Sequence, residues 1–132
     1  MRWLVALLAA TSAVLVACTA DAGTAGKQVD VGIEHSRFEP ATFEFAAGTT
    51  VTFVVRNTDP IDHEFILGDV ATQERHEAGR HARHGAVPGE ISVPAGSTRM
   101  TTYTFVRPGR LIIGCHLPKH YAYGMRADVR VT

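Results

Sequence analysis

Short runs in which apolar and polar residues alternate recur along this chain, and glycine or proline turns separate them. Alternation with a period of two places successive side chains on opposite faces of an extended segment, so it predicts half-buried β-strands. We count about eight such strands, enough for two packed sheets. The expected stretches are 29–33, 43–45, 50–55, 65–67, 91–93, 100–105, 111–113 and 127–131. The chain is therefore predicted to be all-β, a sandwich or a barrel.

Charge and composition narrow the function classes. The 132 residues include 13 Lys and Arg against 13 Asp and Glu, and 45% of them are hydrophobic. A hydrophobic share in the globular range argues against wholesale disorder. A nucleic-acid binder needs a net basic face, which this balance does not supply. The length suits a single domain.

The first residues have the pattern of an export signal. Arg2 supplies a positive charge, and the stretch 3–16 that follows has none. That stretch is shorter than a membrane-spanning helix needs. It ends in Leu-Val-Ala-Cys at Cys18, which resembles the bacterial lipobox, where a cysteine is acylated and becomes the first residue of the mature protein. The alternative is an ordinary signal peptide cut between Ala17 and Ala22, with Cys18 incidental.

This pattern divides the chain into a lipoprotein signal peptide at 1–17, a flexible tether at 18–27 and a compact domain at 28–132. We therefore expect an exported protein on the periplasmic side of the cell envelope, attached to the membrane by a lipid on Cys18. Lipidation leaves Cys115 as the only thiol of the exported domain. A lone thiol in an oxidising compartment is a liability unless something occupies it.

Cys115 opens the frame Cys-x4-His-x4-Met, which continues through His120 to Met125 in the turn between two predicted strands. His63 lies far upstream, beside another predicted strand. Two imidazoles, a thiolate and a thioether are a ligand set for copper, because soft sulfur suits Cu(I) and imidazole suits both oxidation states. A loop of this length can fold its three donors around one point. His116 should point to the opposite face of the strand from Cys115, so we do not expect it to be a ligand.

With these four residues in one frame, the chain resembles the cupredoxins, the plastocyanin and azurin superfamily of type 1 blue copper proteins. The resemblance covers about residues 28–132, and the spacing is similar to that of rusticyanin and auracyanin. It implies an eight-stranded Greek-key β-sandwich with a short helical insertion and one copper at one end. It also implies one-electron transfer with a redox protein partner, by a protein that is not an enzyme. The implied copper ligands are His63, Cys115, His120 and Met125.

Two positions set the chain apart from azurin-like members. Glu64 follows the upstream histidine where those members often carry Asn or Ser, a residue that ties the two ligand loops together. Lys119 stands where many relatives have Gly. The start His63-Glu64-Phe65, followed by a charged insertion, resembles a subgroup of exported cupredoxins associated with copper tolerance. A second function therefore stays open, a homeostasis protein that binds or buffers periplasmic copper and meets a copper-handling partner.

The charged insertion at 69–89 interrupts the strand pattern. Its early part predicts a short exposed helix followed by a loop, and it carries His76, His81 and His84. Two interpretations stay open: a solvated polar face that keeps the insertion soluble, or a second, weaker copper or zinc site with Glu77. If the helix continues to His84, then Glu77, His81 and His84 share one face.

Three residues around the ligand loop, Lys119, Tyr121 and Tyr123, also have two interpretations. They are ordinary surface, or they form a docking patch for the redox partner, because aromatic residues are enriched in interfaces. We expect a monomer that binds one type 1 copper and no nucleic acid.

Overall fold

The computed structural model describes residues 26–80 and 84–132. The predicted signal peptide, Cys18 and most of the predicted tether lie outside the described residues, as does His81. The described residues are mostly β, with a single helix, as the alternation predicts. Among them, no helix is long and apolar enough to cross a membrane.

The described residues contain nine strands, so the predicted count of eight is wrong by one. The missed strand is β2, whose three residues contain a single apolar side chain, Phe38, and therefore show no alternation. It forms a hairpin with β1 through His35 and Ser36, both with left-handed backbone angles (φ 52° and 53°). The strands are β1 (Lys27–Glu34), β2 (Arg37–Glu39), β3 (Thr42–Phe45), β4 (Thr50–Asn57), β5 (His63–Gly68), β6 (Glu90–Val93), β7 (Thr98–Thr104), β8 (Gly109–Gly114) and β9 (Arg126–Val131).

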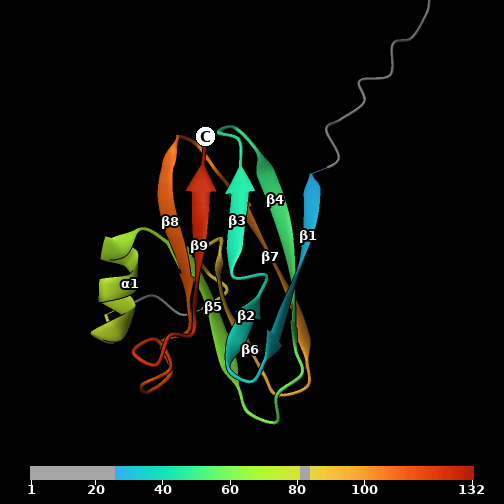
Figure 1. Cartoon of the computed structure of the whole chain (residues 1–132), viewed down its shortest axis with the longest axis vertical. Helices are drawn as coiled ribbons and strands as arrows, with labels where there is room; N and C mark the ends of the chain where they lie inside the picture. Colours follow the sequence, from blue (N-terminus) through green and yellow to red (C-terminus); the bar gives the residue numbers. More distant parts are fainter. Residues whose placement is uncertain (1–25, 81–83) are drawn as a thin grey trace, which may run out of the picture.

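The strands form two sheets that face each other as a sandwich (Figure 1). One sheet has the order β2-β1-β4-β7 and the other has the order β3-β9-β8-β5-β6. Both sheets are mixed, because β1 runs parallel to β4 and β3 runs parallel to β9. In Figure 1 the connection between β4 and β5 and the connection between β8 and β9 both lie toward the lower end of the sandwich, away from the C-terminus.

The core between the sheets is built from inward-facing apolar side chains, with aromatic rings at its centre. Phe45 stacks on Phe105 with ring centroids 4.6 Å apart, and both rings meet Phe53 edge to face. On β5, Phe65 and Leu67 belong to this core, while the alternate residues of the strand face outward. Each step along β5 therefore changes the face of the sheet that a side chain reaches.

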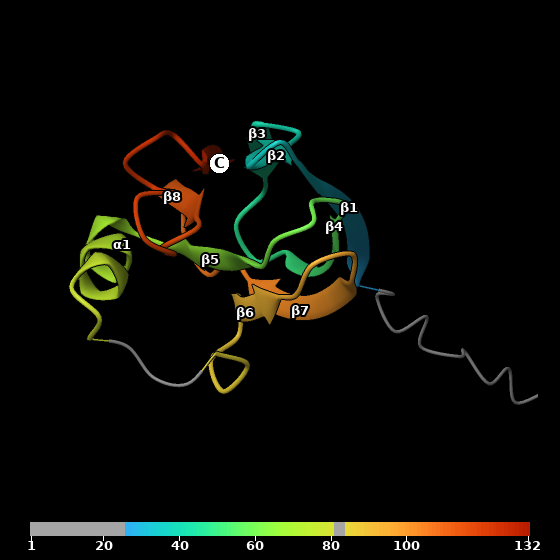
Figure 2. The same ribbon diagram turned by 90° about the horizontal axis from the view of Figure 1, so that it is seen from below.

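The outer face of β5 and β8 is covered by the helix α1 (Val70–Glu77), as Figures 1 and 2 show. The helix begins at Asp69, whose carboxylate accepts a hydrogen bond from the Thr72 amide at 2.8 Å. It approaches the sheet closely because Gly114 has no side chain, and a Cβ there would lie 2.6 Å from Oε1 of Gln73. The helix is thus not wholly exposed, since Gln73 and His76 are buried.

The predicted short helix followed by a loop is present, but the helix ends at Glu77. Gly79 follows with a left-handed φ of 64°. The helix therefore does not continue to His84, as a shared helical face for Glu77, His81 and His84 would require.

Candidate metal centre

Three of the four residues in the predicted copper frame converge at the lower end of the sandwich. The ligand atoms of His63, Cys115 and His120 all lie within 4.8 Å of one another. The Sγ atom of Cys115 is 3.3 Å from Nδ1 of His120 and 3.9 Å from Nδ1 of His63. His63 and Cys115 are fully buried, whereas His120 is half-buried. We call these three residues the inner cluster.

The loop from Cys115 to Met125 is closed by its own backbone. The amide of Cys115 donates to the carbonyl of Met125 at 3.2 Å, and the amide of Met125 donates to the carbonyl of His120 at 3.0 Å. Lys119 has a left-handed backbone (φ 71°), the conformation that glycine adopts most easily. Met125 is fully buried and follows His120 in the same loop. Its role as axial ligand stays a prediction.

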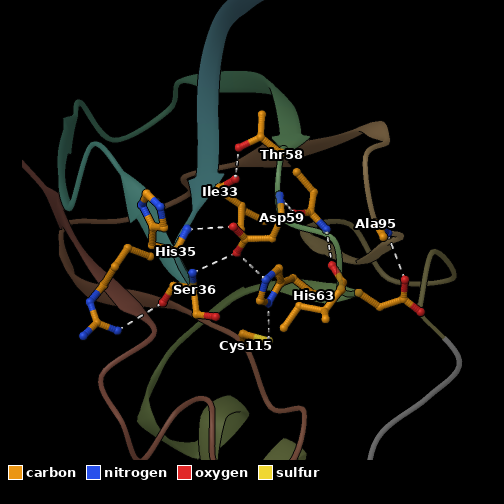
Figure 3. Close-up of polar contacts among 12 residues, drawn as sticks. Ile33, His35, Ser36, Thr58, Asp59, His63, Ala95 and Cys115 are labelled. Carbon is orange, nitrogen blue, oxygen red and sulfur yellow. Dashed lines mark hydrogen bonds and ion pairs between the residues drawn. The ribbon is translucent and has the colours of Figure 1, made fainter.

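Asp59, which no motif in the sequence singles out, orients the upstream histidine. Its carboxylate accepts hydrogen bonds from the amides of His35 at 2.7 Å and Ser36 at 2.8 Å (Figure 3). The same carboxylate lies 2.8 Å from Nε2 of His63, which leaves Nδ1 directed toward Cys115. Burial raises the pKa of Asp59, but the three hydrogen bonds outweigh it and hold the pKa below its ordinary value. A carboxylate behind a ligating imidazole fixes the ring and its tautomer.

The turn that carries Asp59 is itself held by Asn57. The buried Asn57 amide donates to the carbonyls of Ile61 at 2.8 Å and Val93 at 3.0 Å, and its oxygen accepts from the amide of Asp59 at 3.0 Å. The β2 hairpin supplies the remaining partners of the carboxylate, and nothing in the sequence shows that this hairpin meets this turn.

Glu64 ties the two ligand-bearing segments together. Its amide donates to Sγ of Cys115 at 3.3 Å, and its carboxylate accepts a hydrogen bond from the amide of His116 at 3.1 Å. The departure from Asn or Ser at this position therefore keeps the tie between the loops.

The ionisation of the inner cluster suits a metal cation. Burial raises the pKa of Cys115 to about 11, so the free protein carries a thiol that a bound cation would deprotonate. Burial and the neighbouring His63 lower the pKa of His120, which favours the neutral, ligating imidazole. Two imidazoles and a buried thiol fit copper, which binds both donor types.

The insertion residues reach partners that the sequence analysis did not foresee. Oε1 of Glu77 lies 2.7 Å from Nδ1 of His116. Nδ1 of His84 lies 3.0 Å from Oγ of Ser92. Glu77 and His84 thus have different partners. His116 points away from Cys115 to the outer face, as predicted.

The three docking candidates are not equivalent. Lys119 and Tyr123 are exposed. Tyr121 is half-buried, because its ring stacks on His116 at a centroid distance of 4.6 Å and Arg126 lies over it at 5.7 Å. Lys119 and Tyr123 are therefore the side chains that a partner could reach first.

Comparison with known proteins identifies a family and relatives for this chain. The model of the cupredoxin-like domain family matches residues 4–83. The Copper-resistant cuproprotein CopI of Rubrivivax gelatinosus is 35% identical over 115 residues, which cover 84% of this chain and 70% of that protein.

Solved structures share the fold. Reduced auracyanin from Roseiflexus castenholzii has a TM-score of 0.64 at 20% identity, over 81% of this chain and 98% of that chain. The McoA multicopper oxidase of Aquifex aeolicus has a TM-score of 0.57 at 13% identity, over 83% of this chain but 30% of the oxidase.

Proposed function

Because the chain belongs to the cupredoxin-like family and is a copper-binding protein, we propose that it transfers single electrons through one copper held by His63, Cys115, His120 and Met125. The observation that carries the proposal is the convergence of the three donors of the inner cluster, whose ligand atoms all lie within 4.8 Å of one another. Bound copper supplies a one-electron couple between Cu(II) and Cu(I).

The surroundings of the donors support fast electron exchange. Asp59 fixes the His63 ring, Glu64 holds the Cys115 sulfur, and the loop backbone joins Met125 to both Cys115 and His120. Ligands that are fastened from behind move little when the charge of the metal changes, so the reorganisation energy stays small. Four protein donors also fill the positions around one copper, which favours a carrier over an enzyme.

The half-buried edge of His120 is the natural route for electrons, because the other two donors of the inner cluster are fully buried. We place the docking patch for a redox partner there, with Lys119 and Tyr123 exposed beside it. Aromatic side chains are enriched in such interfaces.

The experiment that tests the copper site is the visible spectrum of the Cu(II) protein. The unsubstituted protein should be strongly coloured, blue to green, and Cys115→Ser should lose the visible band while its far-ultraviolet circular dichroism still reports a folded β protein. The exposed imidazole of His35 offers the matched control, and His35→Asn should keep the colour. A colourless Cu(II) form of the unsubstituted protein would sink the assignment.

Copper tolerance is the second candidate function, favoured by the identity to a relative named as a copper-resistant cuproprotein. Growth at rising copper concentration separates it from plain electron transfer. If tolerance is the function, cells that depend on the Cys115→Ser variant lose growth at copper levels that cells with the unsubstituted protein survive. Equal growth favours a carrier for a respiratory partner.

We further propose that the protein works in the cell envelope as a lipid-anchored monomer. The support is the export pattern and the lipobox that ends at Cys18. The unsubstituted protein should fractionate with membranes, and Cys18→Ala should release it or block its processing. An intact mass that shows an unmodified start at a residue other than Cys18 would contradict the anchor.

A further inference from the structure

A second group of imidazoles and carboxylates lies on the outer face of the five-stranded sheet, directly behind the inner cluster. His63 and Glu64 are consecutive residues of β5, and consecutive strand residues reach opposite faces. Cys115 and His116 directly follow β8, and the His116 ring turns away from Cys115 to contact α1. Glu64 and His116 therefore lie on the outer face, where the His116 ring meets Glu77 and Gln73 of α1 and the Glu64 carboxylate meets His84. We call the following residues the outer cluster: Glu64, His76, His84, Glu90 and His116.

The rings of the outer cluster are as close to one another as those of the inner cluster. The ring centroids of His76 and His84 are 5.4 Å apart, and those of His76 and His116 are 5.5 Å apart. The rings of His63 and His120, which belong to the inner cluster, are 5.1 Å apart. With metal–nitrogen bonds of about 2.0–2.1 Å, two imidazoles at this spacing can reach one ion after small rotations.

Carboxylates accompany two of these rings. Oε1 of Glu90 lies 3.3 Å from Nε2 of His76, and Oε1 of Glu64 lies 3.4 Å from Nδ1 of His84. The four side chains are 1–13% exposed. Burying this many ionisable groups together is costly unless they pair or bind a metal. Glu64 and Ile66 are two residues apart on β5 and therefore share a face. Across the strand pair, Glu64 lies opposite Ser92 and Ile66 lies opposite Glu90, so Glu90 projects from the same face as Glu64.

His116 has a different part in the outer cluster. Its Nδ1 lies 2.7 Å from Oε1 of Glu77, and its Nε2 lies 2.7 Å from Oε1 of Gln73. The amide nitrogen of Gln73 points to the carbonyls of Ile66 and Ile112, so the oxygen toward His116 is assigned by the surrounding hydrogen bonds. Both ring nitrogens of His116 thus contact side chains of α1, so His116 borders the cluster and is not one of its metal donors.

We propose that His76, His84 and Glu90 bind a second Cu(II) ion on the outer face, with Glu64 beside His84. Imidazole and carboxylate are nitrogen and oxygen donors, and such a set favours Cu(II) over the other divalent first-row ions, Zn(II) included. In residues 26–80 and 84–132 the inner cluster is the only group of three His, Cys, Asp or Glu side chains whose ligand atoms all lie within 4.8 Å of one another. The outer donors must rotate out of their present hydrogen bonds, so this site is weaker than the inner one.

The experiment is a titration of the apo full-length chain with Cu(II) alone, followed by visible and electron paramagnetic resonance spectra. The unsubstituted protein takes up two equivalents, and only the first produces the thiolate colour. His76→Ala with His84→Ala takes up one equivalent with its colour unchanged. Glu74→Gln is the matched control, because it removes an exposed carboxylate of α1 that lies outside the outer cluster, and it keeps both equivalents.

A milder variant protects the test from loss of folding. Glu90→Gln keeps the shape of the side chain and one acceptor oxygen but removes its charge, and it weakens the second equivalent by at least about tenfold. Zn(II) added in excess displaces the second copper and leaves the coloured one. If the unsubstituted protein, the double variant and Glu90→Gln all bind the same number of Cu(II) ions with the same affinity, the second site is refuted. The thiolate colour reports separately on the inner cluster.

Discussion

The five-stranded sheet carries a histidine cluster on each face, and the two clusters differ in where their nitrogen atoms are directed. In the inner cluster, Nδ1 of His63 and of His120 are directed toward the sulfur of Cys115, while Asp59 holds the far side of the His63 ring. In the outer cluster, Nε2 of His76 is directed toward Glu90, and Nδ1 of His84 is directed toward Ser92 and Glu64. The ring spacing is nearly the same in both, so spacing alone does not make a strong metal site.

The difference comes from what lies behind each ring. A buried carboxylate behind His63 leaves the other nitrogen of that ring directed toward Cys115, whereas Nε2 of His76 and Nδ1 of His84 already have side-chain partners. A carboxylate that holds a ring from behind prepares the ring to bind a metal. A side chain bonded to the nitrogen that would face the metal must first move away. The following substitutions act on one cluster and leave the other.

The largest effect is expected from Asp59→Ala. It removes the acceptor of two backbone amides and of His63, which leaves buried polar groups without partners. We expect a loss of about 3 kcal/mol in the free energy of unfolding, measured by urea denaturation. The colour of the inner copper should also shift, because the His63 ring loses its support. Asp62→Ala removes an exposed carboxylate that accepts one amide bond from Ala95 and should cost less. Equal losses in both variants would contradict the role of Asp59.

Gln73→Leu should destabilise the packing of α1 on the outer face and leave the inner cluster unchanged. The buried Gln73 amide donates to the carbonyl of Ile112 at 2.9 Å and accepts from His116 at 2.7 Å. We expect a loss of about 2 kcal/mol, because these partners stay buried without a hydrogen bond. Hydrogen exchange of the α1 amides should become faster, whereas the thiolate colour should be unchanged. A change in colour equal to that of Asp59→Ala would show that the two faces are not independent.

The smallest effect is expected from Asp69→Ala, which removes the N-cap of α1. The loss should be about 1 kcal/mol at neutral pH. Hydrogen bonds from the Thr72 amide and hydroxyl lower the pKa of Asp69 below its ordinary value of 3.8. A carboxylate with a lowered folded pKa stabilises the protein above that ordinary value, and the contribution disappears as the pH falls through the folded pKa. The difference between the two proteins in urea should therefore shrink in acid. A difference that stays constant from neutral pH to below pH 3 would contradict the capping role.

Much of the fold could be predicted from alternation, because a strand with one face in the core repeats every two residues. The pattern located every long strand and the break at the insertion. It failed at β2, where Phe38 alone faces the core, and alternation cannot appear with one apolar residue. The charges of the insertion predict a helix but not its burial. The helix packs closely on the sheet at Gly114, and this contact forms only because β8 lies beside β5.

The donor types expected for the copper site follow from the sequence, because Cys115, His120 and the predicted axial ligand Met125 share one short loop, and a loop keeps its residues near one another. Tertiary structure alone decided how those donors are held. Asp59 and the amides of His35 and Ser36 meet only because the β2 hairpin folds onto the turn before β5. Tertiary structure also places Glu64 between the two clusters. The pairing of β5 with β8 keeps the Glu64 amide at the sulfur of Cys115, while the Glu64 side chain points outward. Contacts between distant segments depend on how sheets assemble, and no local pattern of residues records that assembly.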